Sequence, residues 1–285
     1  MTLKTIQRVH PAVRDDIGDL ITQRPVPSAH LDQIDPFLFL NHHGPQVYPP
    51  NNGGLPFGPH PHRGFETVTF ILDGLLAHRD SAGHESIIGP GGVQWMTAGS
   101  GLVHAEVSPR EFMQTGGPLE ILQLWVNLPP ALKMTAPRYT GLQRDRIPVV
   151  ELDGGKARLN LVSGTYGGVT GPFESLTGVF MSTVEMQAGA RLRLDNLLDR
   201  NVFLYVVRGI VAVEPDIVSA MHLAEFEPQG DELEIVCNQD CVLLLGHAEP
   251  IREPVVAHGP FVMNTREEIQ QAIVDYQAGR FGAPI

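Results

Sequence analysis

The sequence is poor in charged residues and has no strongly basic segment. Only 18% of its 285 residues are Asp, Glu, Lys or Arg, and 20 basic against 32 acidic residues give a net charge of −12. We therefore expect no direct binding to nucleic acid. No apolar run approaches the roughly 18 residues that a membrane-spanning helix needs, and we expect no membrane association.

Cysteine is scarce as well. Cys237 and Cys241 are the only two, and three residues separate them. A metal or redox pair typically has two intervening residues and further ligands nearby, so we expect two structural thiols in a reducing compartment, with an opportunistic disulfide as the alternative. The chain starts Met-Thr-Leu-Lys without an apolar leader. We expect a soluble cytoplasmic protein, or a nuclear one if the source is eukaryotic.

Glycine and proline are abundant. The 30 glycines and 24 prolines make nearly a fifth of the chain, and 42% of the residues are hydrophobic. This composition favours many short strands joined by tight turns, and it argues against a helical bundle. The length is typical of two domains. The sequence thus predicts an all-β protein with two units.

Short runs rich in β-branched and aromatic residues predict the individual strands. Before residue 128 these runs are 67–73, 75–80, 85–88, 93–96 and 119–127, and beyond residue 137 they are 149–151, 157–162 and 178–185. The proline-containing segment between them interrupts the pattern. We therefore predict one domain over residues 1–130 and a second over residues 131–285.

An internal repeat links the two predicted domains. The segment 201–209 has the length and the apolar pattern of the segment 66–74. Superposing the two places Asp195 opposite His60 and Leu197 opposite His62. The second domain is therefore expected to lack the two imidazoles.

A single helix is predicted near the end of the chain. Thr265 and Glu268 form a capping-box pattern, and apolar residues follow at helical spacing up to Tyr276. Gly279 is a stop signal. We expect this amphipathic helix to pack against the β units.

Two stretches hold pairs of metal-competent side chains separated by one residue. The first, Gly58 to Glu66, reads G-P-H-P-H-R-G-F-E, and the second begins at Gly101. The pairs are His60 with His62, and His104 with Glu106. Alternate residues of a strand point to the same face, so two strands could present all four to one cation.

Spacing leaves several alternatives open. Glu66 has the same parity as His62 and competes with Glu106 as the acidic ligand. Three imidazoles and a carboxylate suit Fe(II), Mn, Ni, Cu or Zn better than Ca or Mg, although a closed structural zinc site would have the same donors. In the alternative without a metal, His60 and His62 lie in a proline-rich loop and His104 is a hydrogen-bonded histidine of the core. We expect His42 or His43 to line the mouth of the site, and His78 and His84 to be solvated.

These motifs resemble those of the cupin superfamily. The matching residues are Gly58, His60, His62, Glu66 and Gly74 in the first motif, with Gly101 and His104 in the second. The wording H-P-H-R-G-F-E-T-V-T, M-T-A-G-S-G-L-V-H-A-E and E-P-I-R-E-P-V-V-A-H-G-P-F-V-M-N-T is similar to the pirin family in particular.

The resemblance implies a fold and a ligand set. Pirins are bicupins, two jelly-roll-like β-barrels with iron in the first, so it implies two cupin barrels and a short C-terminal helix here. It also implies His60, His62, His104 and Glu106 as metal ligands, and it prefers Glu106 to Glu66. Fe(II) is the expected metal, with Mn, Ni, Cu, Co and Zn as alternatives.

The resemblance also implies an activity. Several pirin-like proteins are quercetin 2,3-dioxygenases, so we expect a metal-dependent oxidoreductase that opens a flavonol, or a related enolic or phenolic compound, with dioxygen and releases carbon monoxide. Glu106 is the expected catalytic base. Phe70, Trp95, Met96 and Trp125 are candidates for the walls of a small-aromatic site, with core packing as the favoured alternative for each of them. The alternative is a redox-sensing transcriptional co-regulator with a protein partner. We expect a monomer.

Overall fold

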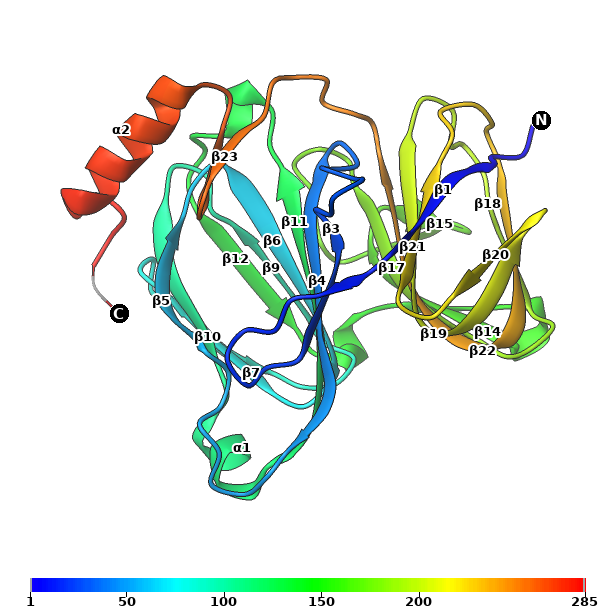
Figure 1. Cartoon of the computed structure of the whole chain (residues 1–285), viewed down its shortest axis with the longest axis horizontal. Helices are drawn as coiled ribbons and strands as arrows, with labels where there is room; N and C mark the ends of the chain where they lie inside the picture. Colours follow the sequence, from blue (N-terminus) through cyan, green and yellow to red (C-terminus); the bar gives the residue numbers. More distant parts are fainter. Residues whose placement is uncertain (1, 284) are drawn as a thin grey trace. The chain divides into compact units, whose positions relative to one another are not determined.

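Strands dominate the computed structural model, which describes residues 2–283 and 285 (Figure 1). The all-β prediction is confirmed. The chain forms two compact units, and we call them the first and second barrels. The first barrel comprises Arg14–Gln23, Phe37–Asp145 and Ile251–Ile285. The second comprises the chain up to Val13, Arg24–Pro36 and Arg146–Pro250.

The first barrel is built from two antiparallel sheets. A four-stranded sheet has the order β5-β10-β7-β8, and a seven-stranded sheet has the order β12-β9-β6-β11-β4-β3-β2. The strands are β2 (Val13–Arg14), β3 (Thr22–Val26), β4 (Phe37–Tyr48), β5 (Phe57–His62), β6 (Phe65–Asp73), β7 (Leu76–Asp80), β8 (Glu85–Ile88), β9 (Val93–Thr97), β10 (Leu102–Val107), β11 (Gly117–Asn127) and β12 (Arg138–Leu142), with a separate hairpin of β23 (Val256–His258) and β24 (Phe261–Met263).

The second barrel has one nine-stranded sheet with the main order β1-β21-β19-β22-β17-β14-β13, and β18 and β20 pair with β22 and β19. Buried aliphatic side chains from these strands fill its interior. The strands are β1 (Ile6–Pro11), β13 (Val149–Leu152), β14 (Ala157–Ser163), β17 (Phe180–Met186), β18 (Arg191–Leu194), β19 (Asn201–Val213), β20 (Asp216–Ser219), β21 (His222–Phe226) and β22 (Leu233–Ala248), with a small hairpin of β15 (Thr165–Tyr166) and β16 (Val169–Thr170).

Strand pairing bears out the internal repeat. In the first barrel β11 pairs with both β4 and β6, and in the second barrel β22 pairs with both β17 and β19. Gly74 and Gly209, which the sequence repeat aligns, have φ values of 87° and 85°. Both are glycines because a side chain would be strained there and would meet backbone atoms of the neighbouring strand.

The first residues of the chain belong to the second barrel, and the last residues belong to the first barrel. Strand β1 pairs with β21 of the second barrel, and residues 251–285 belong to the first. These units are therefore discontinuous in sequence, whereas the predicted division is a single cut after residue 130. Pairing between β1 and β21 joins residues about 200 positions apart, which local sequence patterns do not reveal. The two predicted domain ranges stay a prediction.

Helices are few among the described residues. The two α-helices are α1 (Arg110–Thr115) and α2 (Arg266–Gln277). There are also three short 3₁₀ helices, η1 (Pro130–Leu132), η2 (Arg144–Arg146) and η3 (Asp153–Gly155). The predicted C-terminal helix is confirmed as α2, and Thr265 and Glu268 form the full capping box. Buried Ile269 and Ala272 pack against Phe261 and Met263 of the β24 strand. No helix among the described residues has the length and apolar character to cross a membrane.

Candidate metal centre

Three histidines meet in the first barrel. His60 and His62 lie on β5, and His104 lies on the neighbouring strand β10, directly opposite His60 in the register. One ring nitrogen from each histidine falls within 4.8 Å of the other two. The alternation of side chains along β5 places both of its imidazoles on the same face, as the one-residue spacing predicts.

Backbone carbonyls orient two of the rings. His60 donates its Nδ1 proton to the carbonyl of Gly58 at 2.7 Å, and His62 donates to the carbonyl of Pro260 at 3.2 Å. In the neutral imidazole this leaves the Nε2 lone pair free to accept a metal. Such a carbonyl contact behind the coordinating nitrogen is typical of metal-binding histidines.

His104 provides the test of whether a cation fits. It is 1% exposed, and among the described residues neither of its ring nitrogens has a hydrogen-bond partner. Buried polar atoms in proteins are almost always paired, so an ion is the natural partner for this ring. Burial, followed by the charges of the neighbouring histidines, holds the pKa of His104 well below its usual value and lowers that of His62 to about 3. Both rings are therefore neutral at pH 7, the form that binds metal.

Glu106 extends into the barrel from the same strand as His104. Its Oε1 accepts a hydrogen bond from Thr69 at 3.1 Å and one from Gln94, and its Oε2 accepts from Gln123 at 2.6 Å. Glu106 lies outside the close group of three histidines. The carboxylate is thus buried and held by three donors from the facing sheet.

These donors form a row across the seven-stranded sheet. Thr69 of β6 pairs with Gln94 of β9 on one side and with Gln123 of β11 on the other. Sequence reasoning missed the row, because each residue is one polar position in an otherwise apolar strand. The available signal was that all three are polar residues inside predicted core strands, where burial requires a partner.

Glu66 has a different environment from Glu106. It lies on β6, its Oε1 accepts a 2.6 Å hydrogen bond from Thr97, and it is also outside the group of three histidines. Burial raises the pKa of Glu66 to about 7. Neither carboxylate therefore belongs to the close group, and the assignment of Glu106 as fourth ligand stays a prediction.

The comparisons with known proteins agree with this architecture. The family model described as Pirin matches residues 19–126, and the one described as Pirin C-terminal cupin domain matches residues 181–282. The chain belongs to the pirin family. It is 44% identical over 248 residues to a Pseudomonas aeruginosa protein named "Putative quercetin 2,3-dioxygenase", with 87% of each chain covered.

This pirin also resembles eukaryotic and structurally characterised proteins. It is 36% identical over 271 residues to Pirin of Homo sapiens, covering 91% of this chain and 87% of that one. The crystal structure of a quercetin 2,3-dioxygenase from Acinetobacter baumannii superposes with a TM-score of 0.91 at 31% identity, covering 99% and 100% of the two chains. The predicted bicupin fold is confirmed.

An aromatic wall flanks the histidines of this pirin. The Trp125 ring of β11 lies 5.3 Å from the His62 ring, measured between centroids, and stacks on Phe39 at 4.7 Å. Phe65 completes the group at 4.4 Å from Trp125. Of the four candidate wall residues, Trp125 lies beside the three histidines and is partly exposed. Phe70, Trp95 and Met96 are at most 5% exposed and are part of the buried core.

Of the two histidines expected to be solvated, His78 is buried and His84, with 41% of its side chain exposed, is not. His78, expected to be solvated, is 2% exposed because its ring stacks on Tyr139 at 3.9 Å. Its Nε2 contacts Asp80 at 3.1 Å, and the half-buried His84 contacts the same carboxylate. The centroid of the His78 ring is 5.5 Å from that of His104, so His78 lies next to the three histidines.

The remaining predictions concern His42, His43 and the cysteines. His42 contacts Glu120 at 2.9 Å with both side chains fully buried, and His43 contacts the hydroxyl of Thr22 at 2.9 Å. Both histidines lie on β4, and each is paired with a polar side chain of a neighbouring strand. Their predicted place at the mouth of the site stays a prediction. The cysteines are buried free thiols with their Sγ atoms 3.5 Å apart.

Proposed function

We propose that this pirin is a metal-dependent dioxygenase that acts on a flavonol such as quercetin, or on a related enolic or phenolic compound. The observation that carries the proposal is the juxtaposition of three imidazoles, two of them oriented by backbone carbonyls, with the aromatic wall at Trp125. The two similar proteins whose names include quercetin 2,3-dioxygenase support the same chemistry.

We assign His60, His62 and His104 as metal ligands, with Glu106 as the fourth. Fe(II) is the first choice, and Mn, Ni, Cu, Co and Zn are alternatives that the same donors accept. When bound, the ion would supply Lewis acidity and redox chemistry beside the three histidines that would hold it. The neutral state of His62 and His104 means that loading releases no proton from these rings at pH 7.

The chain's own groups would position the substrate and remove its proton. Glu106 is the proposed general base, and its carboxylate would take the proton of the substrate's 3-hydroxyl. Gln94, Gln123 and Thr69 hold that carboxylate in one orientation. A fixed base avoids much of the entropic cost of alignment during reaction.

The aromatic wall would bind the flat body of the substrate. Trp125 is partly exposed and backed by Phe39 and Phe65, so a planar ligand could stack on it without moving the core. Both atoms of dioxygen would enter the opened product, one in the ester and one in the new carboxylic acid, and the carbon that bears the 3-hydroxyl would leave with its own oxygen as carbon monoxide. Water would be displaced from the apolar face during binding.

The test begins with the metal. Purified protein is loaded anaerobically with Fe(II), its metal content is measured, and then quercetin and air-saturated buffer are added. We expect oxygen consumption with loss of the visible band of quercetin and release of carbon monoxide. His62→Ala should abolish all three. The matched control is His258→Ala, which removes an exposed histidine of β23 in the same barrel.

Two results would contradict the proposal. One is turnover by His62→Ala at the rate of the unmodified protein. The other is full metal loading with no consumption of oxygen in the presence of any flavonol or phenol tested. The second result would favour a regulatory role through a protein partner, which the net charge of −12 permits if that partner is basic.

A further inference from the structure

The second barrel contains a pocket at the end that corresponds to the metal centre of the first. The pocket has a volume of about 590 Å³, within the range of small-molecule sites. Asp195, which the sequence repeat aligns with His60, is one of its lining residues, whereas Leu197, aligned with His62, is fully buried in the core. The metal ligands are therefore replaced here, and a cavity lies beside Asp195.

Strand register extends the correspondence to the aromatic wall. Trp125 pairs with Thr67 and with Phe39 in the first barrel. In the second barrel the equivalent partners, Val202 and Phe180, pair with His247. His247 stacks on Phe180 at 4.6 Å and 7°, as Trp125 stacks on Phe39. A polar ring thus takes the place of the tryptophan.

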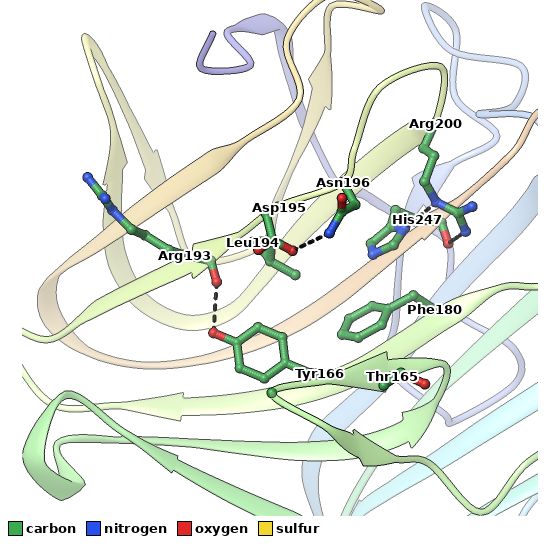
Figure 2. Close-up of a pocket in the computed structure, with 10 residues that line it drawn as sticks. Thr165, Tyr166, Phe180, Arg193, Leu194, Asp195, Asn196, Arg200 and His247 are labelled. Atoms are coloured by element: carbon green, nitrogen blue, oxygen red, sulfur yellow. Dashed lines mark hydrogen bonds between the residues drawn. The ribbon is translucent and has the colours of Figure 1, made fainter. Parts of the chain in front are cut away.

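The protonation of His247 is fixed by its neighbour. Arg200 donates from Nε to His247 Nδ1 at 2.7 Å, and arginine can only donate. The Nδ1 atom therefore has no proton, and Nε2 carries one and is a donor. Burial, with the charge of Arg200 as a second cause, lowers the pKa of His247 to about 3. Figure 2 shows the imidazole next to Arg200 and Phe180, which line the pocket together with it.

Both arginines that line the pocket already contact other groups. Arg193 is paired with Glu234 at 2.5 Å, and Arg200 is near Glu249 at 3.6 Å and donates to the Gly178 carbonyl. The exposed carboxylate of Asp195 accepts from the neutral amide of Asn196 at 2.8 Å. It retains acceptor capacity for a ligand, since a carboxylate offers about four lone pairs.

Tyr166 supplies a partly exposed aromatic surface. Its hydroxyl donates to the carbonyl of Arg193 at 2.8 Å, which fixes the ring across the pocket from Asp195 and Asn196 (Figure 2). A flat ligand on this ring could accept from His247 Nε2 and donate to Asp195. A phenolic hydroxyl can do either. We propose that the second barrel carries a metal-free binding site for a neutral, hydroxylated aromatic compound.

The experiment uses the full chain and resorcinol, whose 1,3-hydroxyls cannot chelate one metal ion. Binding is followed by two-dimensional NMR of the ¹⁵N-labelled protein. We expect saturable shifts at Tyr166 and Asn196, and a Kd about five-fold weaker in Asp195→Asn, which removes the charged acceptor. Asp199→Asn, an exposed change in the same loop, should leave the Kd unchanged. So should His62→Ala, and this separates the site from the metal centre.

Three outcomes would overturn the proposal. The first is the absence of saturable shifts with resorcinol up to its solubility limit, and the second is an equal Kd for Asp195→Asn and the unmodified protein. The third is tighter binding of 3,5-dihydroxybenzoate than of resorcinol at Tyr166, which would make the site one for anions. None of these results bears on oxygen consumption, so failure here leaves the proposed dioxygenase activity unaffected.

Discussion

At the scale of single residues, two buried glutamates of the first barrel have opposite surroundings. Glu106 has three hydrogen-bond donors, whereas Glu66 accepts from Thr97 on Oε1 and is 1% exposed. Each glutamate follows a histidine by an even number of residues, so spacing alone allows either one to be the acidic ligand. Their partners come from strands far away in sequence, and the structure is needed to tell the two carboxylates apart.

Glu66 should make stability depend on pH. Its pKa is raised from 4.5 to about 7 in the folded state, so the folded protein binds more protons than the unfolded chain between these values. The free energy of unfolding should therefore fall as pH rises from 4.5 to 7. By linkage the loss is at most about 3 kcal/mol. Glu66→Gln should remove it, as measured by urea unfolding at pH 4.5, 6 and 8.

The control for this measurement is Glu85→Gln, which changes an exposed glutamate of β8 in the same barrel. Its unfolding free energy should follow that of the unmodified protein at all three values of pH. If Glu66→Gln retains the full decrease between pH 4.5 and 7, the titrating group is another residue.

Replacing Glu106 should affect turnover rather than folding. Glu106→Gln keeps the shape of the side chain but removes the proton acceptor, and we expect at least about a 100-fold loss of oxygen consumption, a typical contribution of general-base catalysis. Gln94 and Gln123 now donate to the carboxylate, and their amides could still pair with the new one. Metal content and the urea midpoint are measured in parallel.

Those parallel measurements separate the two roles assigned to Glu106. Loss of turnover with metal retained indicates a base, and loss of both indicates a ligand. Turnover within two-fold of the unmodified protein at full metal occupancy would exclude Glu106 from both roles.

At the scale of elements, local sequence patterns predicted much of the molecule. The strands at 67–73, 85–88, 93–96 and 119–127 correspond to β6, β8, β9 and β11, and the helix corresponds to α2, because alternation and capping are local signals. The His60 and His62 pair could be placed on a strand for the same reason. The row of Thr69, Gln94 and Gln123 could not, since it depends on the register of three strands.

Helix α2 is joined to the metal strands through Arg63, the residue after β5. Arg63 donates to Asp275 of the helix at 2.8 Å and to the carbonyl of Ser100 at 2.7 Å, and its guanidinium lies 4.6 Å from the centre of the Phe281 ring. The C-terminal segment thereby covers the strand that carries His62. This contact and the apolar packing of Ile269 and Ala272 attach the sequence-distant helix to the first barrel.

We expect Asp275→Asn to loosen this attachment. The side chains of Arg63 and Asp275 are 5% and 11% exposed, so the change leaves a nearly buried guanidinium without its anionic partner. The free energy of unfolding should fall by about 2 kcal/mol, less than for a fully buried pair. Urea unfolding and the rate of proteolysis within residues 266–285 are the measurements.

The matched control is Glu267→Gln, an exposed acidic residue in the first turn of α2. It should cost less than about 1 kcal/mol, through the helix dipole alone. Equal effects from the two substitutions would show that the ion pair with Arg63 does not hold the helix.

At the scale of the whole molecule, duplication has given two barrels with the same strand pairing and different sites. The first has imidazoles where the second has Asp195 and Leu197, and a tryptophan where the second has His247. Because the close group of histidines lies entirely in β5 and β10, metal binding should stabilise one barrel and not the other.

Hydrogen exchange read by mass spectrometry can resolve that asymmetry. Adding Fe(II) anaerobically at 100 times its Kd stabilises the folded state by about 2.7 kcal/mol, which corresponds to roughly 100-fold slower exchange through openings that release the metal. We expect slowing in peptides that cover β5 and β10 and no change in those that cover β18 and residues 233–236 of β22, the equivalent strand pair of the second barrel. His62→Ala should abolish the effect. Slowing of β18 and β22 by the same factor would mean that the two barrels open as one unit, and that the metal serves the second as much as the first.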